Sequence, residues 1–357
     1  MNITIITHTR QGSGGARQAL YQAQGLARAG HTVHFVSKPD FELRKVAPDL
    51  NWVDMPDGLC ALNRTLRSLM PKDEPSVVHA FHNKAVKRIA YLGTLWRLKG
   101  LPVACFAHRG VTKRPGNPLP YLLPGIRTFV VNAVETGQAL PLLWRKNRWR
   151  FVNNCIPASR THTTQSVAEM RNEMNIADDR MVIGYVGYDK REKGAGQLLE
   201  AYAKVRQDLP PSNLVMVGLN HPTWPKMAEE LGITADVRII GRTERVADYV
   251  QTFDLLVFPS YFIESQPNVI MEAMSLGKPV IGSDIGNIKE MIGKEFTFKG
   301  GDVEQIAQKL VQTANDPALL SRMAADNLAT SEKFSEQYRL DAILEIYRKA
   351  LAEDGLV

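Results

Sequence analysis

The feature that most constrains the fold is an alternation of short apolar runs with helical segments, which occurs twice along the chain. The first series contains apolar runs, a glycine cluster at 12–15 and a helical segment at 18–29 with apolar residues at helical spacing. Its apolar runs lie at 3–6, 31–36, 76–79, 101–106 and 128–131. Strands that alternate with helices predict a parallel sheet, because a helix returns the chain to the same sheet edge.

The pattern loosens at residues 151–180 and then resumes, which places a domain boundary there. The second series alternates strands and helices at 181–186, 196–208, 214–217, 224–231, 237–240, 245–252, 255–258, 269–276 and 279–282. A last amphipathic helix at about 336–351 has a predicted apolar face of Tyr338, Ile343, Ile346 and Tyr347. We therefore predict an N-terminal α/β domain at 1–157, a C-terminal one at 158–335, and a final helix within 336–357.

Length and composition agree with two globular domains. A chain of 357 residues exceeds one ordinary domain, and 44% hydrophobic with 23% charged residues is a globular mixture. The three cysteines form no CxxC pair, and neither a signal peptide nor the ~20 apolar residues of a membrane span is found, so we expect a cytoplasmic protein. A net charge of +7 favours an anionic partner: a nucleotide sugar, a membrane surface or nucleic acid.

The first glycine cluster differs from a dinucleotide-binding fingerprint. Arg17 occupies the third glycine position, and the second strand ends at Val36 and Ser37 without the acidic residue that would bind a ribose. Gly14 and Gly15 still allow the backbone to approach an anionic ligand near a helix start. A plain strand-to-helix turn is the alternative interpretation.

Two glutamates, Glu264 and Glu272, surround the predicted start of a helix near Pro267 that ends at Gly277. Both can border the crevice at the carboxyl ends of the strands. The backbone amides at the start of this helix would favour a phosphate group, and they belong to Gln266, Asn268 and Val269. Alternatively, the two acids are a capping residue and a surface residue.

The segment from Glu264 to Gly277 resembles the E-x7-E signature of family 4 of the retaining glycosyltransferases, also called glycosyl transferases group 1. This resemblance implies the GT-B fold, in which two Rossmann-like, doubly wound parallel-sheet domains face each other across a cleft. It also implies that Glu264 contacts the transferred sugar and that Glu272 binds the donor ribose.

The resemblance extends over most of the chain. Gly187 and Lys193 are similar to the family segment whose lysine neutralises the donor diphosphate. Tyr188 stands where many members have an arginine, and whether Lys190 or Arg191 replaces that cation stays open, with a solvated basic turn as the alternative. Arg242 lies where relatives shape the nucleobase pocket, and the identity of the base stays open.

His108 follows a strand and precedes Arg109, at a place where the family often has a histidine facing the transferred sugar. His79 and His82 lack a third ligand at suitable spacing, so we expect no metal site and no cofactor. Lys193, an assisting cation and helix amides would then stabilise the leaving diphosphate. The resemblance implies that the configuration of the sugar is retained.

The acceptor is expected to bind the N-terminal domain. Candidate residues are cations that could meet a glycan, an anionic lipid or a phosphorylated glycolipid: Arg109, Arg145, Lys146 and Arg148. A surface turn is the alternative for the last three. The sequence thus predicts a glycosyltransferase for a cell-envelope glycan or lipopolysaccharide, in peripheral contact with the inner membrane face and not with nucleic acid. The alternatives are a small soluble acceptor or a non-catalytic nucleotide-sugar-binding protein.

Overall fold

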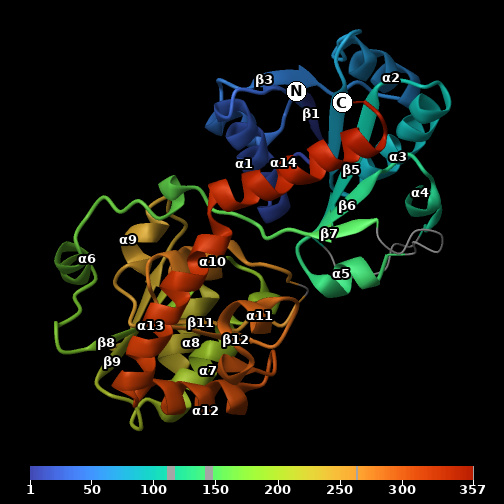
Figure 1. Ribbon diagram of the computed structural model, residues 1–357. Coiled ribbons are helices and arrows are strands. Elements are labelled where there is room, and N and C mark those ends of the chain that lie inside the picture. The colour runs from blue at the N-terminus through green and yellow to red at the C-terminus, as the bar shows by residue number, and fades with distance from the viewer. Residues whose placement is uncertain (111–116, 141–147, 263, 357) are drawn as a thin grey trace. The chain divides into compact units, whose positions relative to one another are not determined.

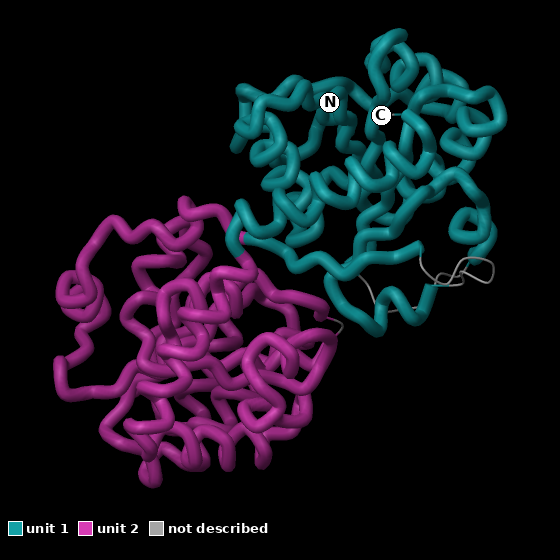
Figure 2. Tube along the Cα trace, in the orientation of Figure 1, with its two compact units in different colours: residues 1–155, 335–357 teal, residues 156–334 magenta. Residues whose placement is uncertain are grey.

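The computed structural model describes residues 1–110, 117–140, 148–262 and 264–356. The chain divides into two compact units, which Figure 2 colours separately. Unit 1 comprises residues 1–155 and 335–357, and unit 2 comprises residues 156–334. The chain therefore leaves unit 1 at Cys155 and returns to it at Ser335.

Unit 1 is built on one parallel sheet of seven strands in the order β3-β2-β1-β4-β5-β6-β7 (Figure 1). The strands are β1 (Asn2–Thr7), β2 (Thr32–Ser37), β3 (Asn51–Asp54), β4 (Ser76–Phe81), β5 (Val103–Arg109), β6 (Thr128–Val131) and β7 (Trp149–Phe151). The helices are α1 (Gly14–Arg28), α2 (Leu59–Ser68), α3 (Asn83–Leu98), α4 (Leu119–Leu122), α5 (Val134–Gln138) and α14 (Glu336–Glu353). The strand order reverses between β1 and β4, so their carboxyl ends border a crevice of the kind that holds ligands in such sheets.

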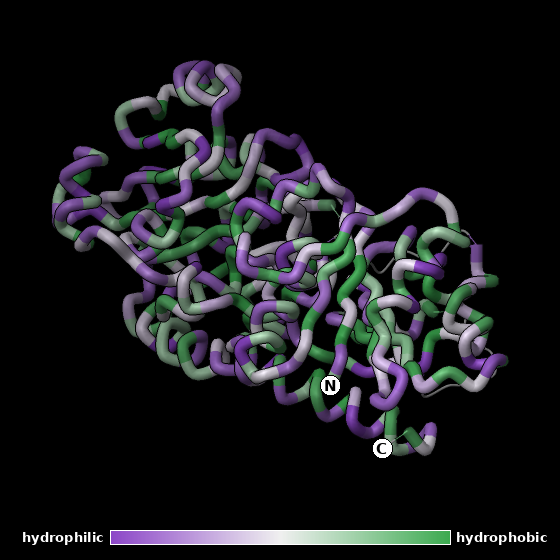
Figure 3. The backbone as a smooth tube through the Cα atoms, turned by 90° about the horizontal axis from the view of Figure 1, so that it is seen from above, coloured by the Kyte–Doolittle hydropathy of each residue, from purple (hydrophilic) through white to green (hydrophobic). Residues whose placement is uncertain are grey.

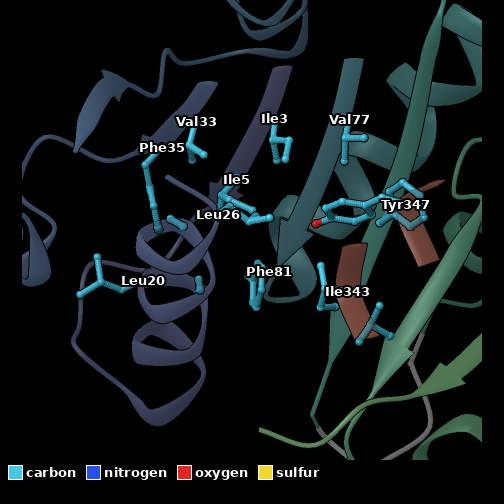
Figure 4. Packing of buried hydrophobic residues seen from close by; sticks show 14 of the residues in the cluster. Ile3, Ile5, Leu20, Leu26, Val33, Phe35, Val77, Phe81, Ile343 and Tyr347 are labelled. Carbon is cyan, nitrogen blue, oxygen red and sulfur yellow. The ribbon is translucent and has the colours of Figure 1, made fainter. Parts of the chain in front are cut away.

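Helices α1 and α14 cover one face of the unit 1 sheet. Figure 4 shows Ile5 of β1 and Val77 of β4 in one hydrophobic cluster with Leu26 of α1 and Tyr347 of α14. All four side chains are almost fully buried. The last helix, although 180 residues or more from the rest of unit 1, thus completes its core.

The predicted apolar face of the last helix is wrong at one position. Ile343 and Tyr347 are buried as expected, whereas Tyr338 is 49% exposed and its neighbour Arg339 is 1% exposed. Arg339 donates to the carbonyl of Asn153 at 2.6 Å and to Gln22 Oε1 at 3.0 Å. Hydrogen bonds to α1 and to the end of unit 1 therefore allow an arginine to occupy a position where helical spacing alone predicts a hydrophobic residue.

Unit 2 contains a second parallel sheet, with six strands in the order β10-β9-β8-β11-β12-β13. The strands are β8 (Met181–Val186), β9 (Ser212–Val217), β10 (Val237–Ile240), β11 (Leu255–Phe258), β12 (Val280–Ser283) and β13 (Thr297–Phe298). The helices are α6 (Val167–Glu173), α7 (Ala195–Val205), α8 (Thr223–Glu230), α9 (Val246–Val250), α10 (Asn268–Ser275), α11 (Ile288–Ile292), α12 (Val303–Ala314) and α13 (Pro317–Ser331). Here the order reverses between β8 and β11.

Hydrophobic clusters lie on both faces of each sheet. Figure 3 shows how hydrophobic stretches of the chain, in green, alternate with hydrophilic stretches, in purple. The short strands β3, β7 and β13 lie at sheet edges, and the sequence pattern does not predict them because edge strands carry fewer apolar residues. Among the described residues, no helix has the length and the apolar composition that a membrane crossing requires.

Candidate functional site

The predicted residues of the C-terminal half meet where the strand order of unit 2 reverses. Strand β8 leads into the loop that carries Gly187 and Lys193, and β11 leads into the loop that carries Glu264. Because β8 and β11 are adjacent and parallel, both loops leave the same edge of the sheet. The topology therefore brings together two loops that are about 70 residues apart in sequence.

Lys193 Nζ forms an ion pair with Glu264 Oε1, and both side chains are 18% exposed. The backbone of the lysine loop is fixed by its contact with the strand β11 loop. The carbonyl of Glu192 accepts hydrogen bonds from the amide of Tyr261 at 3.0 Å and from Ser260 Oγ at 3.2 Å. The ion pair is thus positioned by hydrogen bonds of the backbone as well as by the attraction between the two charges.

Two glycines allow other loops to approach the loop after β11 closely. Gly194 has a φ of +77°, and a Cβ atom there would lie 2.3 Å from the carbonyl oxygen of Pro259. Gly286 has a φ of +56°, and a Cβ atom there would lie 1.9 Å from the carbonyl oxygen of Glu264. Any other residue at 194 would push the lysine loop away from the loop after β11, and any other residue at 286 would push the loop after β12 away from Glu264.

Tyr188 brings a second lysine close to Lys193. Its ring centroid lies 5.0 Å from Lys193 Nζ and 5.4 Å from Lys190 Nζ, and both distances are typical of cation–π contacts. Arg191 is exposed. Lys190 is exposed as well, but its contact with the Tyr188 ring makes it the better candidate for the cation that the resemblance places at position 188.

Helix α10 begins at Asn268 with Pro267 at its N-cap position, close to the predicted start. The amides of its first turn, including those of Asn268 and Val269, have no partner within the helix, and Pro267 has no side-chain acceptor to cap them. Gln266, immediately before, is buried. Gly277, with a φ of +64°, ends the segment as the sequence predicts. The helix start thus offers backbone donors to an anion.

Glu272 lies in the middle of α10 and is only 3% exposed. Arg160 donates from Nε at 2.9 Å and from Nη2 at 2.8 Å to its Oε1 atom. This arginine lies in the connection that opens unit 2, and sequence reasoning missed it. Its only sequence signal is its place just after Ile156 and Pro157, and nothing in the spacing links it to a glutamate more than 100 residues away.

A carboxylate that the sequence analysis did not single out joins the lysine loop to the loop after β9. Asp189 accepts hydrogen bonds from the amide of Asn220 and from Trp224 Nε1, the latter at 2.7 Å. Asn220 Oδ1 in turn accepts from the amide of Arg242 at 3.0 Å, while the side chain of Arg242 is exposed. Leu219, Asn220, Ile239 and Gly241 line a cavity of about 480 Å³ at this edge. Gly241, next to Arg242, therefore borders a cavity between α8 and β10, and the role of this segment in shaping the base pocket stays a prediction.

In unit 1 the glycine cluster meets His82 at the crevice between β1 and β4. Gly14 and Gly15 form the first turn of α1, which Ser13 caps by accepting from the amide of Ala16. His82 Nε2 lies 3.1 Å from the position of a Cβ atom on Gly15, and His82 Nδ1 lies 2.7 Å from Thr7 Oγ1. Burial lowers the pKa of His82 to about 4, so this imidazole is neutral near pH 7. Gly15 thus leaves room for a neutral histidine beside the helix start.

His108 ends β5 and is 6% exposed, with its ring stacked on Phe81 at 4.9 Å. Burial, together with the charge of Arg339, holds its pKa well below the ordinary value. Among the residues that the structure describes, its Nδ1 atom has no hydrogen-bond partner. His108 therefore lies at the carboxyl edge of the sheet as a neutral hydrogen-bonding group.

The four cations predicted to meet the acceptor have different surroundings. Arg109 is buried and donates from Nη1 to Asn83 Oδ1 at 2.7 Å and to Tyr121 Oη at 2.9 Å. Arg148 is 7% exposed, and its Nη2 atom donates to the carbonyls of Leu123 and Ile126. Arg148 thus supports a backbone turn and presents no surface charge, contrary to its predicted role. Arg145 and Lys146 lie outside the described residues.

No group of three or more His, Cys, Asp or Glu side chains suited to a metal ion is found in the described parts of the chain. The predicted site residues fall into two sets. Lys193, Glu264, Glu272, Gln266, Asn268, Val269, Gly187, Arg191 and Arg242 belong to unit 2, whereas Gly14, Gly15, His108, Arg109 and Arg148 belong to unit 1.

Part of unit 2 matches a known family. Residues 166–328 match the family of glycosyl transferases group 1. This part of the chain, which carries Lys193, Glu264 and Glu272, belongs to that family, and the predicted family is confirmed.

Two curated relatives differ in how much of their length they share with this chain. The D-inositol 3-phosphate glycosyltransferase of Rhodococcus erythropolis is 32% identical over 194 residues, which are 50% of this chain and 44% of the relative. The chain thus matches less than half of that protein's length. The N-acetyl-alpha-D-glucosaminyl L-malate synthase of Bacillus anthracis is 23% identical over 345 residues, which cover 90% of this chain and 89% of that one.

A solved structure shares the fold of the whole chain. The crystal structure of Anabaena Alr3699/HepE in complex with UDP has a TM-score of 0.84 and 16% sequence identity, and covers 98% of this chain and 100% of that chain. The two parallel α/β domains and this similarity confirm the predicted GT-B fold.

Proposed function

We propose that this protein is a glycosyltransferase that takes a sugar from a nucleotide diphosphate sugar, with UDP as the nucleotide, and that unit 2 holds most of the donor. The observation that carries the proposal is the Lys193–Glu264 ion pair at the carboxyl ends of β8 and β11. It joins a cation suited to phosphate with a carboxylate suited to sugar hydroxyls, next to the uncapped start of α10.

The donor diphosphate is the part of the substrate for which unit 2 is best equipped. Lys193, with Lys190 beside it on the Tyr188 ring, supplies positive charge. The amides of Asn268 and Val269 supply hydrogen-bond donors in fixed positions. Fixed charges and dipoles of this kind stabilise a leaving group without reorganisation during the reaction.

The transfer is a substitution at the anomeric carbon of the sugar. The bond from this carbon to the diphosphate oxygen breaks, and a bond to the acceptor hydroxyl oxygen forms. The hydroxyl proton leaves with the departing diphosphate, so the products are UDP and the glycosylated acceptor. We propose that the configuration of the sugar is retained. We also propose that no divalent ion takes part, because Lys193 and the α10 amides stabilise the negative charge of the diphosphate.

Glu264 and Glu272 have separate roles in this proposal. Glu264, held by Lys193, accepts hydrogen bonds from the transferred sugar, whereas Glu272 accepts from the ribose hydroxyls. Arg160 fixes the orientation of the Glu272 carboxylate. In unit 1, the neutral His108 offers a hydrogen bond at the edge of its sheet to the reacting sugar.

We propose a cell-envelope glycan or glycolipid, such as a lipopolysaccharide, as the acceptor. The comparisons favour a second candidate, a small soluble acceptor that carries an anionic group. The two relatives described above are named for inositol 3-phosphate and for L-malate. A non-catalytic nucleotide-sugar-binding protein is the remaining alternative, and the experiment below separates it from an enzyme.

The test combines donor binding with donor hydrolysis. The thermal unfolding of the purified protein is measured with UDP, GDP, ADP and CMP sugars, and UDP sugars are expected to stabilise by about 2.7 kcal/mol at a hundredfold excess over Kd. Slow release of UDP, unchanged by a chelator, is expected in the same samples. Stabilisation by no nucleotide sugar would contradict the proposal, and stabilisation without any UDP release would indicate a sensor. Turnover lost with the chelator would refute metal independence.

Replacing Arg160 by alanine is expected to weaken donor binding about tenfold. Loss of a charged hydrogen-bond partner costs about 1–3 kcal/mol, and here it frees the Glu272 carboxylate to rotate away from the ribose. The measurement is UDP titration by calorimetry. Arg180→Ala is the matched control, since Arg180 pairs with Asp236 at 2.7 Å at the amino end of β8, away from the site edge. Equal affinities for the two variants would show that Arg160 has no role in binding.

A further inference from the structure

Helix α3 carries an exposed apolar stripe that no part of the proposed function explains. Tyr91 is 39% exposed, Leu95 is 40% exposed and Leu98 is 80% exposed. Their spacing of four and three residues places them on one side of the helix. The opposite side packs into unit 1 through buried residues such as Ile89 and Trp96.

Cations flank this stripe, and acids are absent from it. At 3.6 residues per turn, Lys84, Lys87, Arg88 and Lys99 lie on the same side of the helix as the three apolar residues. No acidic residue occurs within the helix itself, Asn83–Leu98. We call the side formed by Lys84, Lys87, Arg88, Tyr91, Leu95, Leu98 and Lys99 the α3 face.

The neighbouring helix α2 extends the positive charge. Trp96 Nε1 of α3 donates to Asn63 Oδ1 of α2 at 2.7 Å, and Figure 1 shows the two helices as neighbours. Helix α2 adds the exposed Arg64 and Arg67 and also contains no acid. Four cations of the α3 face therefore border the stripe, and two more lie on the neighbouring helix α2, so a partner for this surface has to be both apolar and negatively charged.

We propose that the α3 face binds the surface of an anionic lipid bilayer. A helix whose apolar face is bordered by cations lies in the plane of the lipid headgroups. Its aromatic and aliphatic side chains insert between the lipids, and its cations contact the phosphates. A folded acidic protein would have to offer a matching groove, whereas a bilayer needs none. The 16-residue helix, about 24 Å long, provides the contact.

The orientation of α3 connects this surface to the site. His82, which touches the position of Gly15, directly precedes the first residue of α3. A helix lying along the bilayer therefore brings the carboxyl edge of the unit 1 sheet to the lipid surface. This step rests on the proposed function. If the acceptor is linked to a lipid, the carboxyl edge of the unit 1 sheet lies where the headgroup of that acceptor lies.

The experiment measures cosedimentation of the full-length chain with vesicles of phosphatidylcholine alone or with about one third phosphatidylglycerol. Binding is expected only with the anionic vesicles and is expected to fall as salt rises. Lys84→Gln with Lys99→Gln is expected to weaken binding about fivefold for each lysine. Leu95→Ser with Leu98→Ser is expected to weaken it about tenfold or more, because the inserted apolar area is lost.

Leu328→Ser is the matched control, since Leu328 is 53% exposed on α13 in unit 2. It is expected to leave vesicle binding unchanged, and thermal unfolding is measured for every variant, besides UDP binding, to show that unit 1 as well as unit 2 is folded. No binding to anionic vesicles, or equal binding by the wild type and both double variants, would overturn the proposal. So would binding of a polyanion such as heparin without binding of vesicles. A protein that binds vesicles but no nucleotide sugar would instead refute the proposed function alone.

Discussion

Replacing Lys193 by alanine is expected to lower the turnover of donor by a factor of about 100 to 1,000, with a much smaller change in donor KM. Removing one fixed donor that stabilises developing negative charge has an effect of this size in other enzymes. Lys193 pairs with Glu264 and is held by the contact of its loop with the loop after β11, and no other cation of the described residues forms an ion pair with Glu264. Steady-state kinetics of UDP release, with and without acceptor, provide the measurement.

Lys190→Ala is the control for the Lys193 variant. Both ammonium groups lie about 5 Å from the Tyr188 ring, but Lys190 is exposed and forms no contact with Glu264 in the described structure. We expect Lys190→Ala to lower turnover less than tenfold. A Lys193→Ala enzyme that keeps turnover within threefold of the wild type, or a larger loss in Lys190→Ala, would contradict the assignment of Lys193.

The second large effect is expected from Gly218→Ala, which should destabilise unit 2 by about 3 kcal/mol or more and abolish donor binding. Gly218 follows β9 with a φ of +94°, and a Cβ atom there would lie 1.9 Å from the carbonyl oxygen of Gly187. A flexible side chain can move away from a new methyl group, whereas this oxygen belongs to the backbone of the lysine loop. The substitution therefore displaces the loop that carries Lys193.

Gly232→Ala separates this close contact from backbone strain. Gly232 also has a positive φ, +66°, but a Cβ atom there would have no atom within 4 Å. Its expected cost is about 1–2 kcal/mol, which is the penalty of a left-handed conformation for alanine. Urea denaturation and UDP titration of both variants provide the measurement. If Gly218→Ala lowers the free energy of unfolding no more than Gly232→Ala does, the close approach of Gly218 to Gly187 does not position the lysine loop.

Local signals in the sequence were sufficient for the fold and for part of the site. Helix α10 starts beside Pro267, because the fixed φ of proline favours a helix start. It ends before Gly277, because glycine readily adopts the positive φ that ends a helix. The alternation of apolar runs and helices predicts both sheets, because burial on two faces requires continuous apolar strands. The reversal of strand order between β8 and β11, which the structure shows, then places Lys193 and Glu264 at one edge.

Contacts between distant residues could be decided only by the tertiary structure. Arg160 reaches Glu272, and Asp189 joins the lysine loop to Trp224, although no spacing in the sequence relates these residues. Arg148 belongs to a basic cluster in the sequence, yet it is buried in the structure and donates hydrogen bonds to carbonyl groups of a turn.

The last helix shows the same division. Its periodicity determines that it is amphipathic and that Ile343 and Tyr347 face inward. Only the hydrogen bonds that Arg339 donates to Gln22 and Asn153 decide that Arg339 is buried while Tyr338 is exposed. Hydrophobic spacing acts along a single element and can be read from the sequence, whereas a buried charge depends on acceptors that other elements bring to it.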